Sequence, residues 1–118
     1  MPFLLLKMVI KNTKSQDRRV FSRIPANISL RFRNRVSNEW GLAKTEDISA
    51  RGIGIITEKS LLKSALLEIW LPIIKKGEKF YTRGKVAWAE EAPGHLYRAG
   101  ILLEKVDLFG MSEVLSAV

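Results

Sequence analysis

The chain has 118 residues, a formal net charge of +8 and no cysteine. This length suits a single domain, and 47% hydrophobic residues are enough to form a buried core. The lack of cysteine excludes disulfides and thiolate chemistry and fits a reducing compartment, so we expect a cytoplasmic protein. The excess of basic residues favours an anionic partner, such as a nucleotide, a nucleic acid or an acidic surface.

The first ten residues form an apolar segment. This segment lacks a basic start and a small-residue cleavage site, and it is far shorter than the roughly 20 residues that span a bilayer. We therefore expect no membrane insertion and interpret it as an N-terminal strand or contact segment, which leaves a homodimer contact or docking on a partner open. The polar stretch from Lys11 to Arg19 predicts a flexible linker. We divide the chain into an apolar segment with linker, residues 1–15, and a folded domain, residues 16–118.

From Ile24 onward, apolar and polar residues mostly alternate with a period of two, which is typical of half-buried strands. Six short strands with turns between them predict a mainly-β protein, a closed or nearly closed six-stranded antiparallel β-barrel. The predicted strands are residues 26–33, 40–49, 52–57, 66–71, 80–90 and 95–105.

The pattern also predicts three local features. Pro72 is expected to end the fourth strand. Val86 and Trp88 are two residues apart and are expected to share one face of the fifth strand. Residues 107–118 predict a short C-terminal helix that Asp107 caps.

Three arginines, Arg18, Arg19 and Arg23, lie within six residues just before the first predicted strand. A guanidinium is planar and always charged, and it can grip phosphate oxygens through two hydrogen bonds or stack on a base. Pro25 disfavours a helix here, so we place the arginines on a loop that leads into the strand. Taken alone, the run favours a solvated basic stretch, because short basic runs are common.

A second polar cluster, Asp47, Ser49 and Gly52, follows the second predicted strand. Asp47 and Ser49 are two residues apart, so in extended backbone they point to the same side and offer a carboxylate and a hydroxyl. Gly52 and Gly54 allow a tight bend or the close approach of another backbone. The alternative is a strand end in which Asp47 pairs with a nearby arginine and Ser49 bonds to local backbone.

In this order and spacing, the two clusters resemble the signature motifs of the PilZ domain family. The arginine cluster matches its Arg-Arg-x-x-x-Arg motif, and the second cluster matches its Asp-x-Ser-x-x-Gly motif. Residues 84–88 resemble its Gly-x-Val-x-Trp segment, and residues 97–101 resemble its Tyr-Arg-x-Gly-hydrophobic strand. The resemblance runs from about Gln16 to the C-terminus. Arg51 departs from the glycine common in relatives, and its side chain either joins the pocket or points to solvent.

The resemblance implies a receptor for cyclic di-GMP, with both motifs around the ligand on the outside of the barrel. By resemblance, the arginines hold phosphates and stack on or hydrogen-bond to guanine. The carboxylate and the hydroxyl reach a guanine edge or a phosphate, and the glycine keeps the surface open. The implied ligand-binding residues are Arg18, Arg19, Arg23, Asp47, Ser49 and Gly52.

The apolar segment directly precedes the arginine loop, which suggests how a signal leaves the domain. We expect ligand binding to order residues 11–19 and to re-aim residues 3–10. The recipient is expected to be an unidentified effector protein that controls motility, exopolysaccharide production or pili.

An enzyme is not expected, and neither is a cofactor or a metal ion. His95 is the only histidine and lies beside a Pro-Gly turn, and no spacing of metal ligands is present. Residues 52–54 lack the third glycine of a dinucleotide fingerprint. Asp47 and Ser49 have no histidine nearby to complete a catalytic set.

Two other functions remain as alternatives. A basic β-barrel could bind single-stranded nucleic acid, because the charge and several aromatic residues permit it. We expect no DNA or RNA partner, since several of these aromatics occupy strand positions where core packing is the default and the basic residues concentrate in one loop. The other alternative is a PilZ-like adaptor that has lost nucleotide binding, against which the intact motifs argue. The aromatics concerned are Trp40, Trp70, Phe80, Tyr81 and Trp88.

Overall fold

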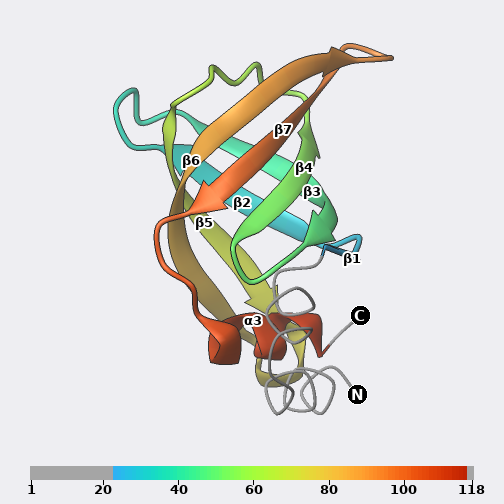
Figure 1. The fold of residues 1–118 in the computed structure, drawn as a ribbon, viewed down its shortest axis with the longest axis vertical. Helices are drawn as coiled ribbons and strands as arrows, with labels where there is room; N and C mark the ends of the chain where they lie inside the picture. Colours follow the sequence, from blue (N-terminus) through green and yellow to red (C-terminus); the bar gives the residue numbers. More distant parts are fainter. Residues whose placement is uncertain (1–22, 117–118) are drawn as a thin grey trace, which may run out of the picture.

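A computed structural model describes residues 23–116 of the chain (Figure 1). Strands β2 to β7 form the wall of a barrel, β1 is a two-residue addition beside β3, and α3 lies at one end. The elements are β1 (Ile24–Pro25), β2 (Ser29–Asn34), β3 (Trp40–Ile48), β4 (Gly52–Thr57), β5 (Leu66–Ile73), the 3-10 turn η1 (Ile74–Lys76), β6 (Glu78–Ala92), β7 (Leu96–Leu103) and α3 (Leu108–Leu115).

The barrel closes because its first and last neighbours pair with each other. The strands follow one another in the order β3, β2, β5, β6, β7 and β4, and β4 pairs again with β3. All of these pairings are antiparallel. The predicted six-stranded antiparallel barrel with a short C-terminal helix is therefore confirmed.

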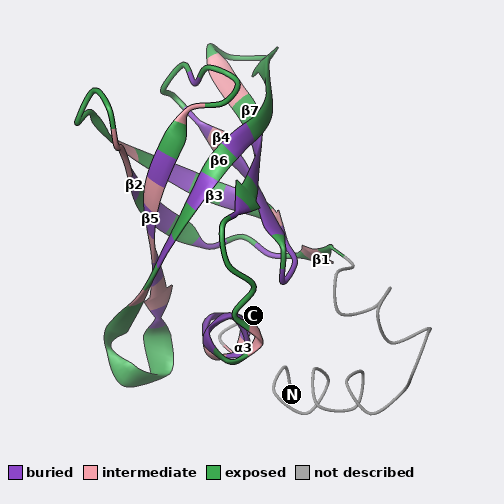
Figure 2. Cartoon of the chain, turned by 60° about the vertical axis from the view of Figure 1, so that its left-hand side comes forward, coloured by how far each residue is buried: buried purple, intermediate pink, exposed green. Residues whose placement is uncertain are grey.

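The inward residues of the strands form one apolar core, and Figure 2 shows bands of buried and exposed residues alternating along the strands. Along β5, Leu67, Ile69 and Leu71 are each almost completely buried, whereas the residues between them are partly exposed. Full burial of one such side chain stabilises the fold by about 1.5–3 kcal/mol. The two-residue alternation in the sequence therefore reflects which side of the wall each residue faces.

Helix α3 lies across one end of the barrel, below β5 in the view of Figure 1. Asp107 caps it as predicted, because its carboxylate accepts a hydrogen bond from the Gly110 backbone N–H at 2.8 Å. Met111, Val114 and Leu115 are buried in the core cluster, so the helix seals this end of the barrel.

The chain enters the barrel through a break between β1 and β2. Ile24 and Pro25 pair with Ile48 and Asp47 at the end of β3, and the pairing of β2 with β3 starts at Ser29. In the gap, the Thr45 hydroxyl donates to the Ala26 carbonyl at 2.6 Å and accepts from the Ile28 N–H at 2.9 Å. The single strand predicted over residues 26–33 is therefore wrong at its start, because the Thr45 hydroxyl bonds to the Ala26 carbonyl and the Ile28 N–H where a regular ladder would use backbone groups.

Pro72 does not end β5, which continues to Ile73, and this corrects the sequence-based expectation. The register of β2 with β5 ends at Trp70, so Pro72 faces no residue of β2. Its missing N–H therefore interrupts no ladder on that side of the strand.

Val86 and Trp88 do not share a face of β6, which corrects a second expectation. The register with β7 shifts between them, since Val86 pairs with Ile101 and Trp88 with Gly100. Ala87 is thus the extra residue of a β-bulge. Val86 points into the core, whereas the Trp88 side chain lies on the outside and is 44% exposed.

Core packing of the aromatic residues was also the wrong expectation for three of them. Trp40 and Tyr81, like Trp88, are close to half exposed. Trp70 and Phe80 are partly buried. His95 does lie in the β6–β7 turn, with a positive φ of 60°. The predicted apolar segment and linker, residues 1–15, lie outside the described residues.

Candidate functional site

The two sequence clusters meet where β1 lies against the end of β3. Arg23 directly precedes β1, and Pro25 of β1 pairs with Asp47. This pairing brings the guanidinium of Arg23 to the carboxylate of Asp47. Arg23 Nη1 donates to Asp47 Oδ1 at 2.6 Å, and both side chains remain partly exposed. Residues 24 positions apart in sequence thus form one charged pair at the surface.

Asp47 is held in position by the glycine that faces it across the ladder. Gly54 pairs with Asp47, and its backbone N–H donates to Asp47 Oδ1 at 3.2 Å. A methyl group at Gly54 would lie only 2.6 Å from that oxygen, so a larger residue would push the carboxylate aside. Gly54 therefore sets the direction in which Asp47 points.

Ser49 organises the tight turn between β3 and β4. Its side chain is almost fully buried, and Oγ accepts from the Gly52 N–H at 3.1 Å and the Arg51 N–H at 3.3 Å. The Ser49 N–H donates to the Gly52 carbonyl at 2.8 Å and closes the turn. The contacts match the alternative stated from sequence: Asp47 pairs with an arginine and Ser49 bonds to local backbone.

Gly52 allows the backbone of β7 to approach closely. A methyl group at this position would lie 2.8 Å from the Ile101 carbonyl oxygen and 3.8 Å from Arg23 Nη2. Contact with a backbone oxygen at that distance cannot be relieved by a side-chain rotation. The missing side chain at Gly52 thus leaves room beside Arg23.

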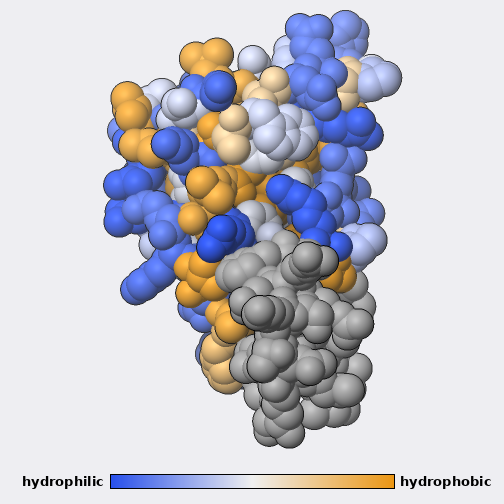
Figure 3. All heavy atoms as spheres, viewed as in Figure 1, coloured by the Kyte–Doolittle hydropathy of each residue, from blue (hydrophilic) through white to orange (hydrophobic). Residues whose placement is uncertain are grey.

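An open cavity of about 290 Å³ lies at this point, and Arg23, Ser49, Gly52 and Trp88 line it. Trp88 reaches the cavity because the bulge at Ala87 turns its indole outward, against Gly100. This face of the barrel is the one seen in Figure 3, where apolar side chains are bordered by strongly hydrophilic ones. Sequence reasoning missed Trp88 as a site residue, since nothing in an alternating pattern signals a bulge.

Four of the six residues implied by the resemblance therefore come together: Arg23, Asp47, Ser49 and Gly52. Arg51 is exposed and also borders the cavity. The two other arginines, Arg18 and Arg19, lie outside the described residues.

No group of three or more histidine, cysteine, aspartate or glutamate side chains within residues 23–116 is arranged to hold a metal ion. In the same part of the chain, no helix has the length and apolar character needed to cross a membrane. The polar side chains that line the cavity are Arg23, Arg51, Ser49 and Trp88, and the Asp47 carboxylate lies beside Arg23.

The family model for the PilZ domain matches residues 17–108, a range that contains both motifs and the whole barrel. The chain belongs to the PilZ domain family. No curated protein matches the sequence significantly.

Solved structures share the fold of this PilZ domain. The PilZ domain of CeSA from a cellulose-synthesizing bacterium matches with a TM-score of 0.58 and 20% identity, covering 82% of this chain and 94% of that one. The PilZ domain of YcgR from Escherichia coli, solved with c-di-GMP, matches with a TM-score of 0.65 and 16% identity over 86% and 88%. The motility inhibitor MotI of Bacillus subtilis matches with a TM-score of 0.62 and 14% identity over 82% of this chain, which spans about half (47%) of MotI.

Proposed function

We propose that this PilZ domain is a cytoplasmic receptor for cyclic di-GMP that signals to another protein and has no catalytic activity of its own. The observation that carries the proposal is the meeting of Arg23 with Asp47 beside an open cavity that Ser49 and Gly52 also line or border. Arg23 of the first motif thus lies beside Asp47, Ser49 and Gly52 of the second, although the two motifs are separate in sequence. The YcgR domain solved with c-di-GMP has the same fold and supports the choice of ligand.

The Arg23–Asp47 pair suggests how the ligand is received. Cyclic di-GMP carries two negative charges, and a half-exposed ion pair contributes only about 0–1 kcal/mol to stability. Arg23 can therefore turn toward a phosphate at low cost, and the Asp47 carboxylate is then free to accept N–H groups from a guanine edge. The Trp88 indole, which borders the same cavity, offers a flat surface on which a guanine can stack.

Arg18 and Arg19 complete the proposed phosphate-binding set from the segment before Arg23. Three guanidiniums are enough to neutralise one bound ligand, and binding would then bring residues 11–19 onto the barrel and re-aim residues 3–10. Hydrogen exchange measured with and without ligand tests this step. Unchanged exchange in residues 3–19 at saturating ligand would refute the ordering but not the binding.

The receptor function is tested by isothermal titration calorimetry with cyclic di-GMP. We expect saturable binding to the wild type, and binding at least tenfold weaker for Arg23→Ala and for Arg19→Ala, since each removes charge-assisted hydrogen bonds worth about 1.5–3 kcal/mol. Lys59→Ala is the matched control, because it removes one exposed positive charge from the β4–β5 connection. Cyclic di-AMP is the control ligand. Absence of cyclic di-GMP binding by the wild type would overturn the proposal.

A further inference from the structure

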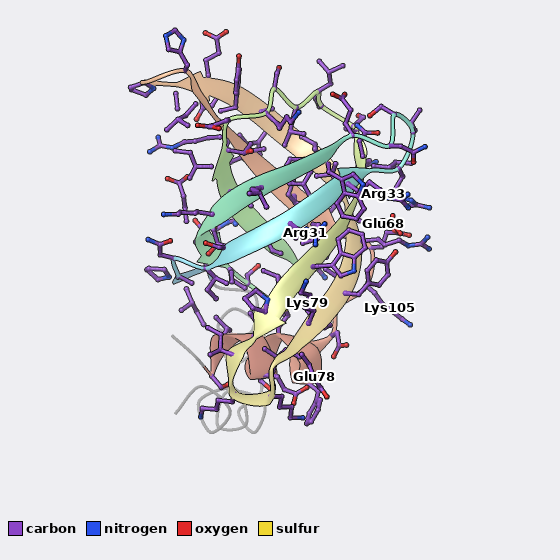
Figure 4. The ribbon with its side chains drawn as sticks, turned by 180° about the vertical axis from the view of Figure 1, so that it is seen from behind. Arg31, Arg33, Glu68, Glu78, Lys79 and Lys105 are labelled. Atoms are coloured by element: carbon purple, nitrogen blue, oxygen red, sulfur yellow. The ribbon has the colours of Figure 1, made fainter. Side chains whose placement is uncertain are left out.

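A second surface lies on the outer face of β2, β3, β5 and β6. It is near Trp40, at the end of β3 that is opposite to Asp47. We call it the Trp40 face. In the ladder, Arg31 lies between β3 and Trp70, Arg33 lies between Trp40 and Glu68, and Trp70 pairs with Tyr81. Figure 4 shows Arg31, Arg33 and Glu68 gathered on this side of the barrel, with Lys79 farther along the same side. The Trp40 face consists of Arg31, Arg33, Trp40, Glu68, Trp70 and Tyr81.

Its aromatic rings are packed on one another and under guanidinium groups. The ring centroids of Trp40 and Trp70 are 5.1 Å apart in a stacked arrangement, and those of Trp70 and Tyr81 are 5.3 Å apart. The guanidinium carbons of Arg31 and Arg33 lie 4.8 Å and 5.8 Å from the centroid of Trp40. Cation–π contacts of this kind hold the side chains in one arrangement before any partner arrives.

Glu68 holds the side chains of Arg33 and Tyr81 in place by accepting hydrogen bonds from both. Arg33 Nε donates to Glu68 Oε1 at 2.7 Å, and the Tyr81 hydroxyl donates to Glu68 Oε2 at 2.5 Å. The hydrogen bond from Tyr81, followed by that from Arg33, lowers the pKa of Glu68. Arg33 also donates through Nη1 to Asn38 Oδ1 at 3.3 Å, so its guanidinium is bonded within the face and its charge is balanced by Glu68. The remaining charge of the face is the positive charge of Arg31.

An apolar hollow of about 360 Å³ adjoins the Trp40 face. Leu42 connects the two, because it pairs with Arg31 in the ladder and also lines the hollow with Ile56 and Leu96. The Leu42 side chain is 71% exposed although it is large and aliphatic. A preformed hollow beside tryptophan, tyrosine and arginine has the composition of the energetic centre of a protein–protein interface.

We propose that the Trp40 face binds an acidic segment of a partner protein, which places a carboxylate against Arg31 and an apolar side chain in the hollow beside Leu42. Charge complementarity carries the choice of an acidic partner. Single-stranded nucleic acid fits less well, because bases stack on open ring faces and the Trp40 ring already contacts the Trp70 ring and the Arg31 guanidinium.

A second copy of the chain is also disfavoured as the occupant. Its net charge of +8 opposes self-association. Several of its carboxylates already form ion pairs within the chain, such as Glu46 with Arg98 and Glu113 with Lys76. The binding of a partner at the Trp40 face does not depend on cyclic di-GMP binding, so the two proposals can fail separately.

The first experiment is selection of random dodecapeptides displayed on phage against the immobilised full chain, with counter-selection on an Arg31→Ala/Leu42→Ser double variant. Both residues are exposed, so the variant is expected to keep the wild-type fold, which far-UV and near-UV circular dichroism checks. We expect enriched peptides that combine aspartate or glutamate with an aliphatic or aromatic residue. No enrichment over the counter-selected pool, or enrichment without acidic residues, would overturn the proposal.

The second experiment titrates the most enriched peptide and a single-stranded oligothymidylate into labelled protein, observed by the indole N–H signals. The peptide is expected to shift the signals of Trp40 and Trp70, with affinity about tenfold or more weaker for Arg31→Ala and for Leu42→Ser. Lys59→Ala is expected to leave the affinity within about twofold of the wild type, since rim charges contribute little. Equal weakening by Lys59→Ala, tighter binding of the oligonucleotide at the same signals, or sedimentation of the free chain as a dimer that Arg31→Ala abolishes would each contradict it.

Discussion

The two ends of strand β3 carry surfaces of opposite construction. At the Asp47 end, glycines at positions 52, 54 and 100 remove side chains from the outside of the wall, and a cavity forms between a guanidinium and an indole. At the Trp40 end, large rings and guanidiniums fill the same kind of outward position and stack on one another. Trp40 and Asp47 are seven positions apart in β3, which corresponds to roughly 23 Å along an extended strand.

This difference shows how one barrel wall can serve two kinds of partner. Where outward side chains are missing, the backbone and a few polar groups form a recess suited to a small anion. Where outward side chains are large and held together, they form a raised contact surface suited to a macromolecule. Both depend on the same inward residues, which keep the wall rigid.

The largest expected effect separates the two surfaces by affinity. Arg23→Ala is expected to weaken cyclic di-GMP binding by about 2 kcal/mol or more, roughly thirtyfold, whereas Arg31→Ala, with the same loss of charge, should leave it nearly unchanged. Calorimetric titration of both variants measures this. Equal weakening by the two variants would mean that overall charge, and not the Arg23 cavity, attracts the ligand.

The second prediction compares two glycines that each lie against an aromatic ring. A methyl group at Gly41 would overlap the buried ring of Phe32, so Gly41→Ala should lower the free energy of unfolding by about 1–3 kcal/mol. A methyl group at Gly100 would overlap the Trp88 indole, which is exposed enough to move away. Gly100→Ala should therefore cost less stability but weaken cyclic di-GMP binding.

Urea denaturation and ligand titration of both alanine variants provide the measurements. If Gly100→Ala binds cyclic di-GMP like the wild type while its Trp88 fluorescence changes, the indole does not contribute to the ligand site. If Gly41→Ala is as stable as the wild type, Phe32 is less tightly enclosed than its burial indicates.

The smallest expected effect concerns Glu68 and its dependence on pH. Hydrogen bonds from Tyr81 and Arg33 lower the pKa of Glu68 below its ordinary value of 4.5. A lowered carboxyl pKa adds stability that is present above pH 4.5 and is lost as the pH falls through the lowered value. Glu68→Gln should thus be less stable than the wild type at pH 7, and the difference should shrink toward pH 3.

Urea denaturation of the wild type and of Glu68→Gln at a series of pH values measures this difference. Glu91→Gln, in the exposed end of β6, serves as the control and should show little difference from the wild type at any of these pH values. A Glu68→Gln deficit that does not change between pH 7 and pH 3 would exclude the ionised carboxylate as its cause.

The sequence predicted most of the barrel because inward and outward residues alternate along each strand. The pattern could not reveal where the alternation slips. Ala87-Trp88-Ala89 fits either face, so the bulge that turns Trp88 outward appears only once β6 is paired with β7. Thr45 likewise has the sequence position of an ordinary inward residue, and its hydroxyl bridge between β1 and β2 was not foreseen.

For the candidate site, the sequence motifs named Arg23, Asp47, Ser49 and Gly52, but contacts between distant strands decided how these residues are arranged. The Arg23–Asp47 pair depends on a two-residue strand that no periodicity announces. The Trp40 face depends on β2 lying between β3 and β5, which is a property of the topology. Arg31 and Trp40 are nine positions apart in sequence, and only the ladder makes them neighbours.

The three tryptophans allow the central claim to be tested in one titration, because the chain has one at the cavity and two on the Trp40 face. The measurement is the set of indole N–H signals, assigned with single Trp→Phe variants, during addition of cyclic di-GMP. We predict that the Trp88 signal shifts and saturates while those of Trp40 and Trp70 stay in place. A Trp88 signal that does not move at saturating ligand, or equal shifts of all three, would contradict binding at the Arg23 cavity.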